Sequence, residues 1–362
     1  MITNVPNVSD ALLIERYESV VRGYVDEVLG EKITTGDLEK AACQRYLDDL
    51  KDDGHRFRLN KLKAAKALRF FPKLRHTQGK YKGKRFELYP IQAFMVWNIF
   101  GWERLNEPFR RFNEAYVTLA RGNGKTPFGS ALSLKVTGFD TPPMNRAETY
   151  LAATKMDQAD IAYTDIREYI VSSGLSGRFD ANDRLIRAPR GSTIRKLPAD
   201  SKTNDGFRCY FVLVDEFHAW TESHRGFYDV IETGLGKFDQ TLMVIITTAG
   251  DDQSLLWREK DNLATKIVER DNSIRLDEMF VMICRLDEGD DVLDIDNYPK
   301  SNPLMRYGVA RRDKIEKMIK QAEIIPSIKS KLTRYYANQM VESGNKAITA
   351  AMWSRAVCEV AA

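Results

Sequence analysis

The chain has 362 residues, enough for one large domain or two, which excludes a small scaffold held together by disulfide bonds. Its composition, with 43% hydrophobic and 29% charged residues, fits neither a disordered nor a fibrous protein. The apolar runs are much shorter than the ~20 residues of a membrane-spanning helix, and the polar N-terminus has no signal-peptide pattern, so we expect a cytoplasmic protein without a membrane partner.

The small net charge of +4 conceals a strongly basic stretch. Thirteen lysines and arginines lie between Lys51 and Arg85, together with two aspartates. A local excess of positive charge is what a nucleic-acid-binding surface requires, because neutralised phosphates release their counterions. A solvated helix face would carry the same charge, and the sequence leaves both interpretations open.

The N-terminal part of the chain has a helical pattern. Apolar residues at helical spacing between positions 11 and 30 predict an amphipathic helix that ends at Gly30. We expect helical structure to continue from Asp37 to Phe71. Residues 1–78 are therefore predicted to form a helical N-terminal region.

From residue 79 the pattern changes to short apolar strands that alternate with helices. The predicted strands are Ala115–Ala120, Thr149–Ala153, Tyr210–Val214, Leu242–Thr247 and one strand between Ile274 and Arg285. Helices are predicted at residues 124–137 and 156–173, and two extended arms around Arg190–Gly191 predict an inserted hairpin. Such alternation indicates a mostly parallel α/β sheet flanked by helices, which we place at residues 79–285.

The last part of the chain is predicted to be a helical lid or linker, residues 286–362. It begins with the acidic run Asp287–Asp296, which we expect to be a loop because its carboxylates lack the spacing of a calcium site. Helices follow at residues 309–322 and 327–340, with Pro326 at the boundary of the second.

The most informative segment is a strand, a polar turn and a helix within residues 114–136. Exposed N–H groups in such a turn and the helix dipole favour a bound anion, Lys125 would neutralise β- and γ-phosphate charge, and the Thr126 hydroxyl would ligate Mg²⁺. The motif departs from G-x-x-x-x-G-K-[ST], since Leu119 occupies the first glycine position. The predicted phosphate-binding residues are Arg121, Gly122, Asn123, Gly124, Lys125 and Thr126.

A second segment, the apolar strand 210–214, ends in the carboxylates of Asp215 and Glu216. In an open α/β sheet, ligands bind at the carboxyl ends of the strands. Asp215 would hold Mg²⁺ through water, and Glu216 would orient and deprotonate the attacking water. Other Asp-Glu pairs, such as Asp26–Glu27, do not follow an apolar strand and are interpreted as surface charges.

A third strand, at residues 242–247, ends in the hydroxyls of Thr247 and Thr248. These threonines could sense the γ-phosphate or couple hydrolysis to motion. Threonines also simply terminate strands, and the sequence leaves this alternative open.

In this order, these elements resemble the large terminase subunit of tailed double-stranded-DNA bacteriophages, the ATPase that pumps the genome into the procapsid. The resemblance extends from about Gly79 to Trp353. The segment 79–102 is similar to the family's region before the phosphate loop, where Gln92 matches the adenine-recognising glutamine. The turn ARGNGKT is similar to the family's deviant Walker A motif, with Arg121 inside the loop.

Further motifs belong to the same resemblance. VLVDEFHAW at residues 212–220 looks like the Walker B motif with catalytic Glu216, and ITTAG at 246–250 looks like the coupling motif. The segments SNPL at 301–304 and NQM at 338–340 are also similar. The resemblance implies a P-loop ATPase of the additional-strand, catalytic-glutamate class, with ATP and Mg²⁺ as cofactors.

Two departures from the family pattern affect the predicted site. Other members often carry Arg-Gly shortly before the Walker B strand as a trans-acting arginine finger, whereas this chain has Asp205–Gly206 there. Arg208, which follows, and Arg195 are the candidates for this catalytic role. Full-length members also carry a C-terminal nuclease domain, and we expect this chain to represent the ATPase part alone.

The resemblance also implies partners and a location. The partners are double-stranded DNA, other copies of the chain in a homo-oligomeric ring on the procapsid portal, and the small terminase subunit. The expected location is the host cytoplasm and, transiently, the portal. A nucleic-acid helicase is the alternative enzyme, and a DNA-binding scaffold with a degenerate nucleotide site is the non-enzymatic alternative, which the presence of Lys125 and Glu216 disfavours.

Overall fold

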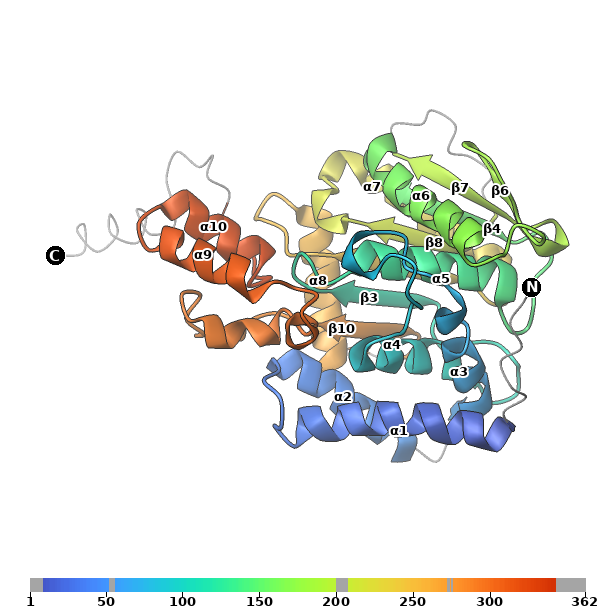
Figure 1. Cartoon of the computed structure of the whole chain (residues 1–362), viewed down its shortest axis with the longest axis horizontal. Helices are drawn as coiled ribbons and strands as arrows, with labels where there is room; N and C mark the ends of the chain where they lie inside the picture. The colour runs from blue at the N-terminus through green and yellow to red at the C-terminus, as the bar shows by residue number, and fades with distance from the viewer. Residues whose placement is uncertain (1–8, 52–55, 200–207, 272–273, 275, 343–362) are drawn as a thin grey trace.

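A mostly parallel β-sheet with helices on both faces forms the centre of the molecule (Figure 1). The structure is a computed structural model that describes residues 9–51, 56–199, 208–271, 274 and 276–342. The C-terminal helices form a lobe that projects from one side of this central body, at the left of Figure 1. The predicted fold class, an α/β P-loop architecture, is confirmed.

Within the described residues the main sheet has eight strands in the order β10-β3-β9-β8-β4-β7-β6-β5. The first six are parallel to one another. β6 runs antiparallel to β7, and these two strands are the arms of the hairpin predicted around Arg190–Gly191; β5 then pairs antiparallel with β6 at the edge of the sheet. The strands are β3 (Glu114–Thr118), β4 (Glu148–Ala153), β5 (Asp180–Ala181), β6 (Ile186–Arg187), β7 (Thr193–Pro198), β8 (Cys209–Asp215), β9 (Leu242–Thr247) and β10 (Met279–Ile283).

The strand order places β9 between β3 and β8. Thr118 of β3 is paired with Thr247 of β9, and Ile246 is paired with Asp215 of β8. Because all three strands are parallel, their polar carboxyl ends meet at one edge of the sheet. An additional strand thus separates the phosphate-loop strand from the strand that carries the two carboxylates, as the additional-strand class requires.

The central strands are buried on both faces, which explains their continuous apolar sequences. Every residue of β8 and β9 is buried. Helix α5 (Lys125–Phe139) packs closely over them because Gly129 has no side chain: a Cβ there would lie 2.8 Å from Leu213 Cδ1. The remaining helices of the sheet region are α6 (Met156–Ser172), α7 (Arg225–Gly234) and α8 (Leu255–Val268).

The N-terminal helices share their hydrophobic core with the sheet region. They are α1 (Asp10–Leu29), α2 (Asp37–Lys51) and α3 (Lys61–Leu68), and they lie with α4 (Pro90–Gly101) below the sheet in Figure 1. The prediction of helix from Asp37 to Phe71 is wrong at β1 (Phe57–Leu59), which pairs antiparallel with β2 (Trp102–Arg104). Pairing with a strand more than 40 residues away overrides the local helical pattern there.

The C-terminal lobe has a small hydrophobic cluster of its own. It contains α9 (Arg312–Ala322) and α10 (Pro326–Tyr335). The acidic run is irregular as predicted, apart from its last two residues, which begin a 3-10 helix at Ile295–Lys300. Helix α10 ends at Tyr335, before the predicted Met340, and the left-handed backbone of Asn338, with φ of +59°, is incompatible with helix at that position.

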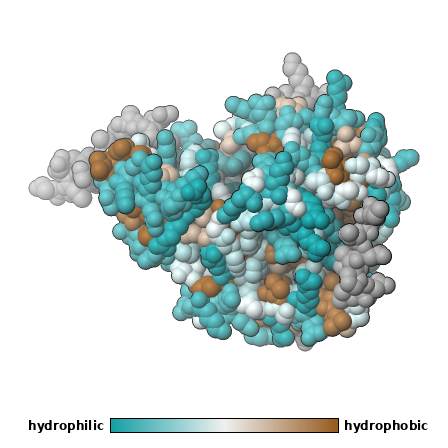
Figure 2. Space-filling model, in the orientation of Figure 1, coloured by the Kyte–Doolittle hydropathy of each residue, from teal (hydrophilic) through white to brown (hydrophobic). Residues whose placement is uncertain are grey.

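The remaining described elements are single turns of 3-10 helix. They are Phe71–Lys73, Gly79–Tyr81, Pro189–Gly191, Phe217–Ala219, Glu222–His224, Leu235–Lys237 and Met305–Tyr307. The face seen in Figure 2 is mostly hydrophilic, with small separated apolar patches. None of the helices in the described ranges is long and apolar enough to span a membrane.

Candidate active site

The loop between β3 and α5 lies at the carboxyl edge of the sheet, next to the C-terminal lobe. Leu119, which replaces the first glycine of the usual motif, is 3% exposed and belongs to the core. Gly122 and Gly124 have φ of +87° and +66°, conformations that strain any residue with a Cβ. The two remaining glycines therefore determine the path of the loop.

The loop presents a row of free amide groups. Within the described part of the chain, the N–H groups of residues 122 to 126 have no hydrogen-bond acceptor, and Lys125 and Thr126 begin helix α5. Consecutive free N–H groups at the N-terminus of a helix attract an anion, and the helix dipole adds to this attraction. The loop therefore has the geometry of an anion-binding site.

Lys125 is folded back into this loop and is 8% exposed. Its Nζ donates to the carbonyl oxygens of Leu119 at 2.8 Å and Ala120 at 3.2 Å. Burial lowers the pKa of Lys125 to about 8, although Glu216 and Asp215 act in the opposite direction. The ammonium group is held by weak neutral acceptors that a phosphate can replace.

Asp215 and Thr126 are brought together across the sheet edge. The Thr126 hydroxyl donates to Asp215 Oδ2 at 2.8 Å, and the Glu216 N–H donates to Asp215 Oδ1 at 2.8 Å. Burial and then the charge of Glu216 raise the pKa of Asp215 to about 6. Two hard oxygen ligands are adjacent here, a combination that suits a magnesium ion.

Glu216 follows Asp215 in a left-handed conformation with φ of +50°. A left-handed residue other than glycine is strained, and such strain is common at functional sites. Glu216 Oε2 has no hydrogen-bond partner within the described residues, but His218 Nδ1 lies 3.1 Å from it. Burial alone would raise the pKa of Glu216, yet His218, Lys125 and Arg121 outweigh it and lower the pKa to about 2.

His218 connects this carboxylate to the end of β9. Its backbone N–H donates to Thr247 Oγ1 at 2.9 Å, and its Nδ1 lies 3.2 Å from Thr248 Oγ1. Both threonines are fully buried. The threonines thus lie behind Glu216 with His218 between them, and sequence reasoning missed His218 because no metal or catalytic spacing involves it.

Gln92 has a clear structural contact. Its Oε1 accepts a hydrogen bond from the Tyr89 N–H at 3.2 Å, which caps the N-terminus of α4. The ring of Tyr89 lies against that of Tyr307, with centroids 4.7 Å apart. Recognition of adenine by Gln92 stays a prediction.

Arg208 lies at the opposite end of β8 from Asp215 and Glu216. The seven residues of β8 span roughly 20 Å, so Arg208 does not reach the nucleotide loop of its own chain. Arg195 is exposed on β7, and Asp205–Gly206 lies outside the described residues. A role for either arginine in a neighbouring subunit stays a prediction.

The C-terminal lobe contacts the phosphate loop directly. The Arg121 N–H donates to Tyr335 O at 2.9 Å, and the Arg121 guanidinium lies 3.5 Å from the centre of the Tyr335 ring. Asn123 Nδ2 donates to Asn302 Oδ1 at 3.0 Å. Arg121 and Asn123 of the predicted site are therefore engaged by the lobe, and Tyr335 had no signal in the sequence.

Asn338 joins the lobe to two strand ends. Its side chain accepts a hydrogen bond from the Ala249 N–H at 2.7 Å and donates to Thr118 Oγ1 at 2.9 Å and Cys284 O at 2.7 Å. Asn338 is 2% exposed. Its left-handed backbone is tolerated because three buried hydrogen bonds offset the strain.

Asn338→Ala should lower the free energy of unfolding by about 2–3 kcal/mol, because it leaves three buried polar groups without partners. Asn338→Gly loses the same bonds but relieves the backbone strain, so it should be less destabilised than the alanine variant by about 1 kcal/mol. Denaturant unfolding measures both. Unfolding of Asn338→Ala at the parent midpoint would contradict the assigned bonds.

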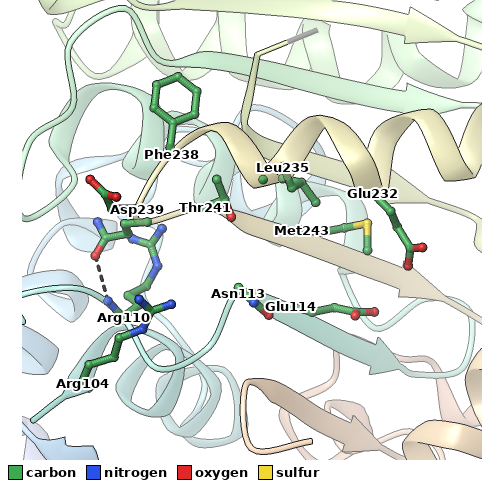
Figure 3. Close-up of a pocket in the computed structure, with 12 residues that line it drawn as sticks. Arg104, Arg110, Asn113, Glu114, Glu232, Leu235, Phe238, Asp239, Thr241 and Met243 are labelled. Atoms are coloured by element: carbon green, nitrogen blue, oxygen red, sulfur yellow. Dashed lines mark hydrogen bonds between the residues drawn. The ribbon is translucent and has the colours of Figure 1, made fainter.

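A cavity of about 370 Å³ lies at the other edge of the sheet, at the N-terminal ends of β3 and β9 (Figure 3). Arg104 and Arg110 lie on one side of it, and Glu114 and Glu232 on the other. The Arg110 N–H donates to Gln240 Oε1 at 2.9 Å. Positive and negative charges offset each other in this cavity, and none of the predicted nucleotide-binding residues lines it.

Comparison with known proteins agrees with the geometry. Residues 90–266 match the family described as terminase large subunit, ATPase domain. The large terminase of bacteriophage HK97 has a similar crystal structure, with a TM-score of 0.64 and 17% identity over 77% of this chain and 55% of that chain. The large terminase ATPase domain of a Thermus phage has a TM-score of 0.44 and 17% identity over 63% of this chain and 88% of that chain.

A curated relative is Protein YmfN of Escherichia coli, which is 33% identical over 111 residues, 30% of this chain and 23% of that protein. The chain thus spans about a quarter of YmfN and about half of the HK97 protein. The matched family segment runs from the start of α4 through most of α8 and includes the phosphate loop and the carboxylate strand. Residues 90–266 of this chain therefore form an ATPase domain of the terminase large subunit family.

Proposed function

We propose that this chain is the ATP-hydrolysing motor part of a terminase, which uses ATP to move viral double-stranded DNA into a procapsid. The observation that carries this proposal is the meeting of Lys125, Thr126, Asp215 and Glu216 at one sheet edge, in front of a row of free amide groups. This edge offers positive charge and N–H donors for phosphates and a carboxylate for the attacking water.

ATP and Mg²⁺ are the ligands that these residues fit. The free N–H groups of the loop would hold the β-phosphate, and Lys125 would leave the Leu119 and Ala120 carbonyls to contact the β- and γ-phosphates. Thr126 and Asp215 would hold Mg²⁺, whose charge neutralises phosphate oxygens when it is bound. Since the pKa of Asp215 is about 6, its carboxylate binds a cation less well below that pH.

Glu216 would act on the water that attacks the γ-phosphate. Its pKa of about 2 keeps it ionised at neutral pH, so it attracts and orients the water through its charge. His218 contacts both the Glu216 carboxylate and Thr247 at the end of β9. A shift of the carboxylate toward the water would therefore change the contacts of His218 with Thr247 and Thr248. This arrangement supports a coupling role for the two threonines.

The partners proposed for the motor are other copies of the chain in a ring on the procapsid portal, duplex DNA and the small terminase subunit. The location is the host cytoplasm and, during packaging, the portal. Arg208 is exposed and remote from its own site, which is compatible with a contribution to the site of a neighbouring subunit. Gln92 is proposed to recognise the adenine base.

The purified chain should hydrolyse ATP weakly, because an arginine finger from a neighbour is typically worth about 10³ to 10⁵ in rate and is absent in a monomer. It should not cut plasmid DNA with Mn²⁺, since Lys300 lies 2.8 Å from the carboxylates of both Asp287 and Asp290 in the acidic loop. ATP turnover with and without duplex DNA is the test. Strand unwinding would favour the helicase alternative, and no ATP turnover even at high protein concentration would contradict the proposal.

A further inference from the structure

A basic pocket lies at the far end of α5 from the phosphate loop. It has a volume of about 350 Å³ and is formed by α3, the turn that follows α3 and the C-terminal end of α5. None of its lining residues is acidic. Its apolar lining includes Phe70, Phe100 and Phe139, and its basic lining consists of Lys63, Lys66, Arg69, Lys73 and Lys135.

Two of these cations are held inside the protein. Lys135 is 3% exposed, and its Nζ lies 2.9 Å from Asp140 Oδ1 and 3.6 Å from the centre of the Phe100 ring. Lys63 Nζ donates to Pro108 O at 2.7 Å. Burial lowers the pKa of both ammonium groups, that of Lys135 to about 8. Lys63 Nζ also lies 3.7 Å from Glu103 Oε2, so both inner cations are paired with buried carboxylates.

The cations at the mouth are poorly compensated. Lys66 lies 3.7 Å from a carboxylate oxygen of Asp10. Among the residues that the structure describes, no carboxylate lies within ion-pair distance of Arg69 or Lys73. Burial and then repulsion by neighbouring arginines lower the pKa of Lys73. Cations that repel one another are stabilised when an anion binds between them.

The same segment continues the positive charge along the surface. After the pocket, the chain crosses the face of α5 toward the C-terminal lobe, where Lys80 Nζ donates to Gly308 O at 2.8 Å (Figure 1). Three exposed cations of this turn also have no carboxylate partner in the described ranges: Lys82, Lys84 and Arg85.

The start of the basic stretch differs from its end. Arg56, Arg58 and Lys61 each pair with a carboxylate, at 2.7 to 2.9 Å. The free positive charge of the stretch is therefore concentrated at the mouth of the pocket and in the turn that follows it, and the stretch does not act as a uniform basic face.

We propose that this pocket binds a backbone phosphate of duplex DNA, which Arg69 and Lys73 hold at its mouth. DNA as the source of the phosphate rests on the proposed function, whereas the charge of the pocket does not. A nucleic-acid backbone is favoured over a free phosphate because the pocket is open and adjoins further cations that can meet successive phosphates.

Helix α5 connects this pocket to the nucleotide site. Lys135 follows Lys125 by ten positions, which corresponds to about 15 Å along a helix axis. A DNA phosphate and the phosphates of ATP would therefore bind at opposite ends of the same helix. Stimulation of ATP turnover by DNA should depend on the pocket, whereas basal turnover should not.

The test compares Arg69→Glu and Lys73→Glu with Lys317→Glu, which makes the same charge change on the exposed face of α9. Binding of a fluorescent DNA duplex to the full chain without nucleotide is measured between 50 and 200 mM salt. Each pocket variant should lower the slope of log affinity against log salt by about 0.9, the value for one lost phosphate contact. Lys317→Glu should leave the slope unchanged.

Several results would overturn the proposal. One is an unchanged slope in both pocket variants, and another is an equal change in Lys317→Glu, which would indicate a general charge effect. Competition by inorganic phosphate that the pocket variants abolish, with unchanged DNA binding, would assign the pocket to a free anion. If the variants unfold at the same temperature as the parent and keep its basal ATP turnover, their fold is intact. If the parent protein does not hydrolyse ATP, the proposed motor function is contradicted. The DNA-binding measurement still tests the pocket in that case, because it is made without nucleotide.

Discussion

Lys125→Ala should lower the affinity for ATP by about 100-fold or more and abolish turnover. The ammonium group would contact two phosphates, and hydrogen bonds to charged groups are worth about 1.5 kcal/mol or more each, which corresponds to about tenfold per contact. Calorimetric titration with ATP and Mg²⁺ measures the effect. If this variant binds ATP as tightly as the parent protein, the loop does not have its proposed phosphate-binding role.

Stability is the control for this variant, because Lys125 is buried and its loss leaves the Leu119 and Ala120 carbonyls without a donor. The unpaired carbonyls cost about 1–3 kcal/mol, partly offset because a buried cation is also removed. The protein should therefore remain folded at 25 °C. Thermal unfolding of the alanine variant checks this.

The affinity for ATP should also depend on pH through Lys125. Its pKa of about 8 in the free protein means that the ammonium form predominates below pH 8 and is lost as the pH rises above it. At pH 9 about one molecule in ten carries the charge, so the apparent affinity should be about tenfold weaker than at pH 7. Lys125→Arg, which does not titrate in this range, should show a flat profile if it binds ATP.

Glu216→Gln should bind Mg-ATP but turn it over at least about 10²-fold more slowly, because a neutral amide cannot take a proton from water. The loss of the carboxylate also removes a charge that raises the pKa of Lys125. ATP binding to this variant should therefore be measured at pH 7 or below, where Lys125 stays protonated. Single-turnover hydrolysis separates the chemical step from product release.

Asp215→Asn is the matched control on the neighbouring residue. It removes the carboxylate that accepts the Thr126 hydrogen bond, so it should raise the Mg²⁺ concentration needed for half-maximal turnover. Glu216→Gln should leave that concentration near the parent value. If Glu216→Gln hydrolyses ATP at the parent rate, another group activates the water.

The sequence by itself determined the elements whose signals are local. The strand at Leu242–Thr247 and the helix that begins at Met156 were predicted at the residues where they start. Neighbouring residues carry both signals: a continuous apolar run for a strand buried on both faces, and apolar residues at helical spacing for the helix. The phosphate loop and Asp215–Glu216 were also predicted in this way. Strand ends that carry polar residues are visible without knowledge of the fold.

Only the tertiary structure decided which distant residues meet. The sequence implied an additional strand only through a resemblance, and the sheet order places β9 between β3 and β8. The partners of the basic stretch are equally remote: Asp277 neutralises Arg56 from more than 200 positions away, whereas Lys73 has no carboxylate partner in the described residues. The spacing of residues along the chain describes a single helix or strand, whereas charge compensation and burial depend on how these elements pack. The packing buries Lys125 and places Arg208 at the sheet edge opposite its own nucleotide site.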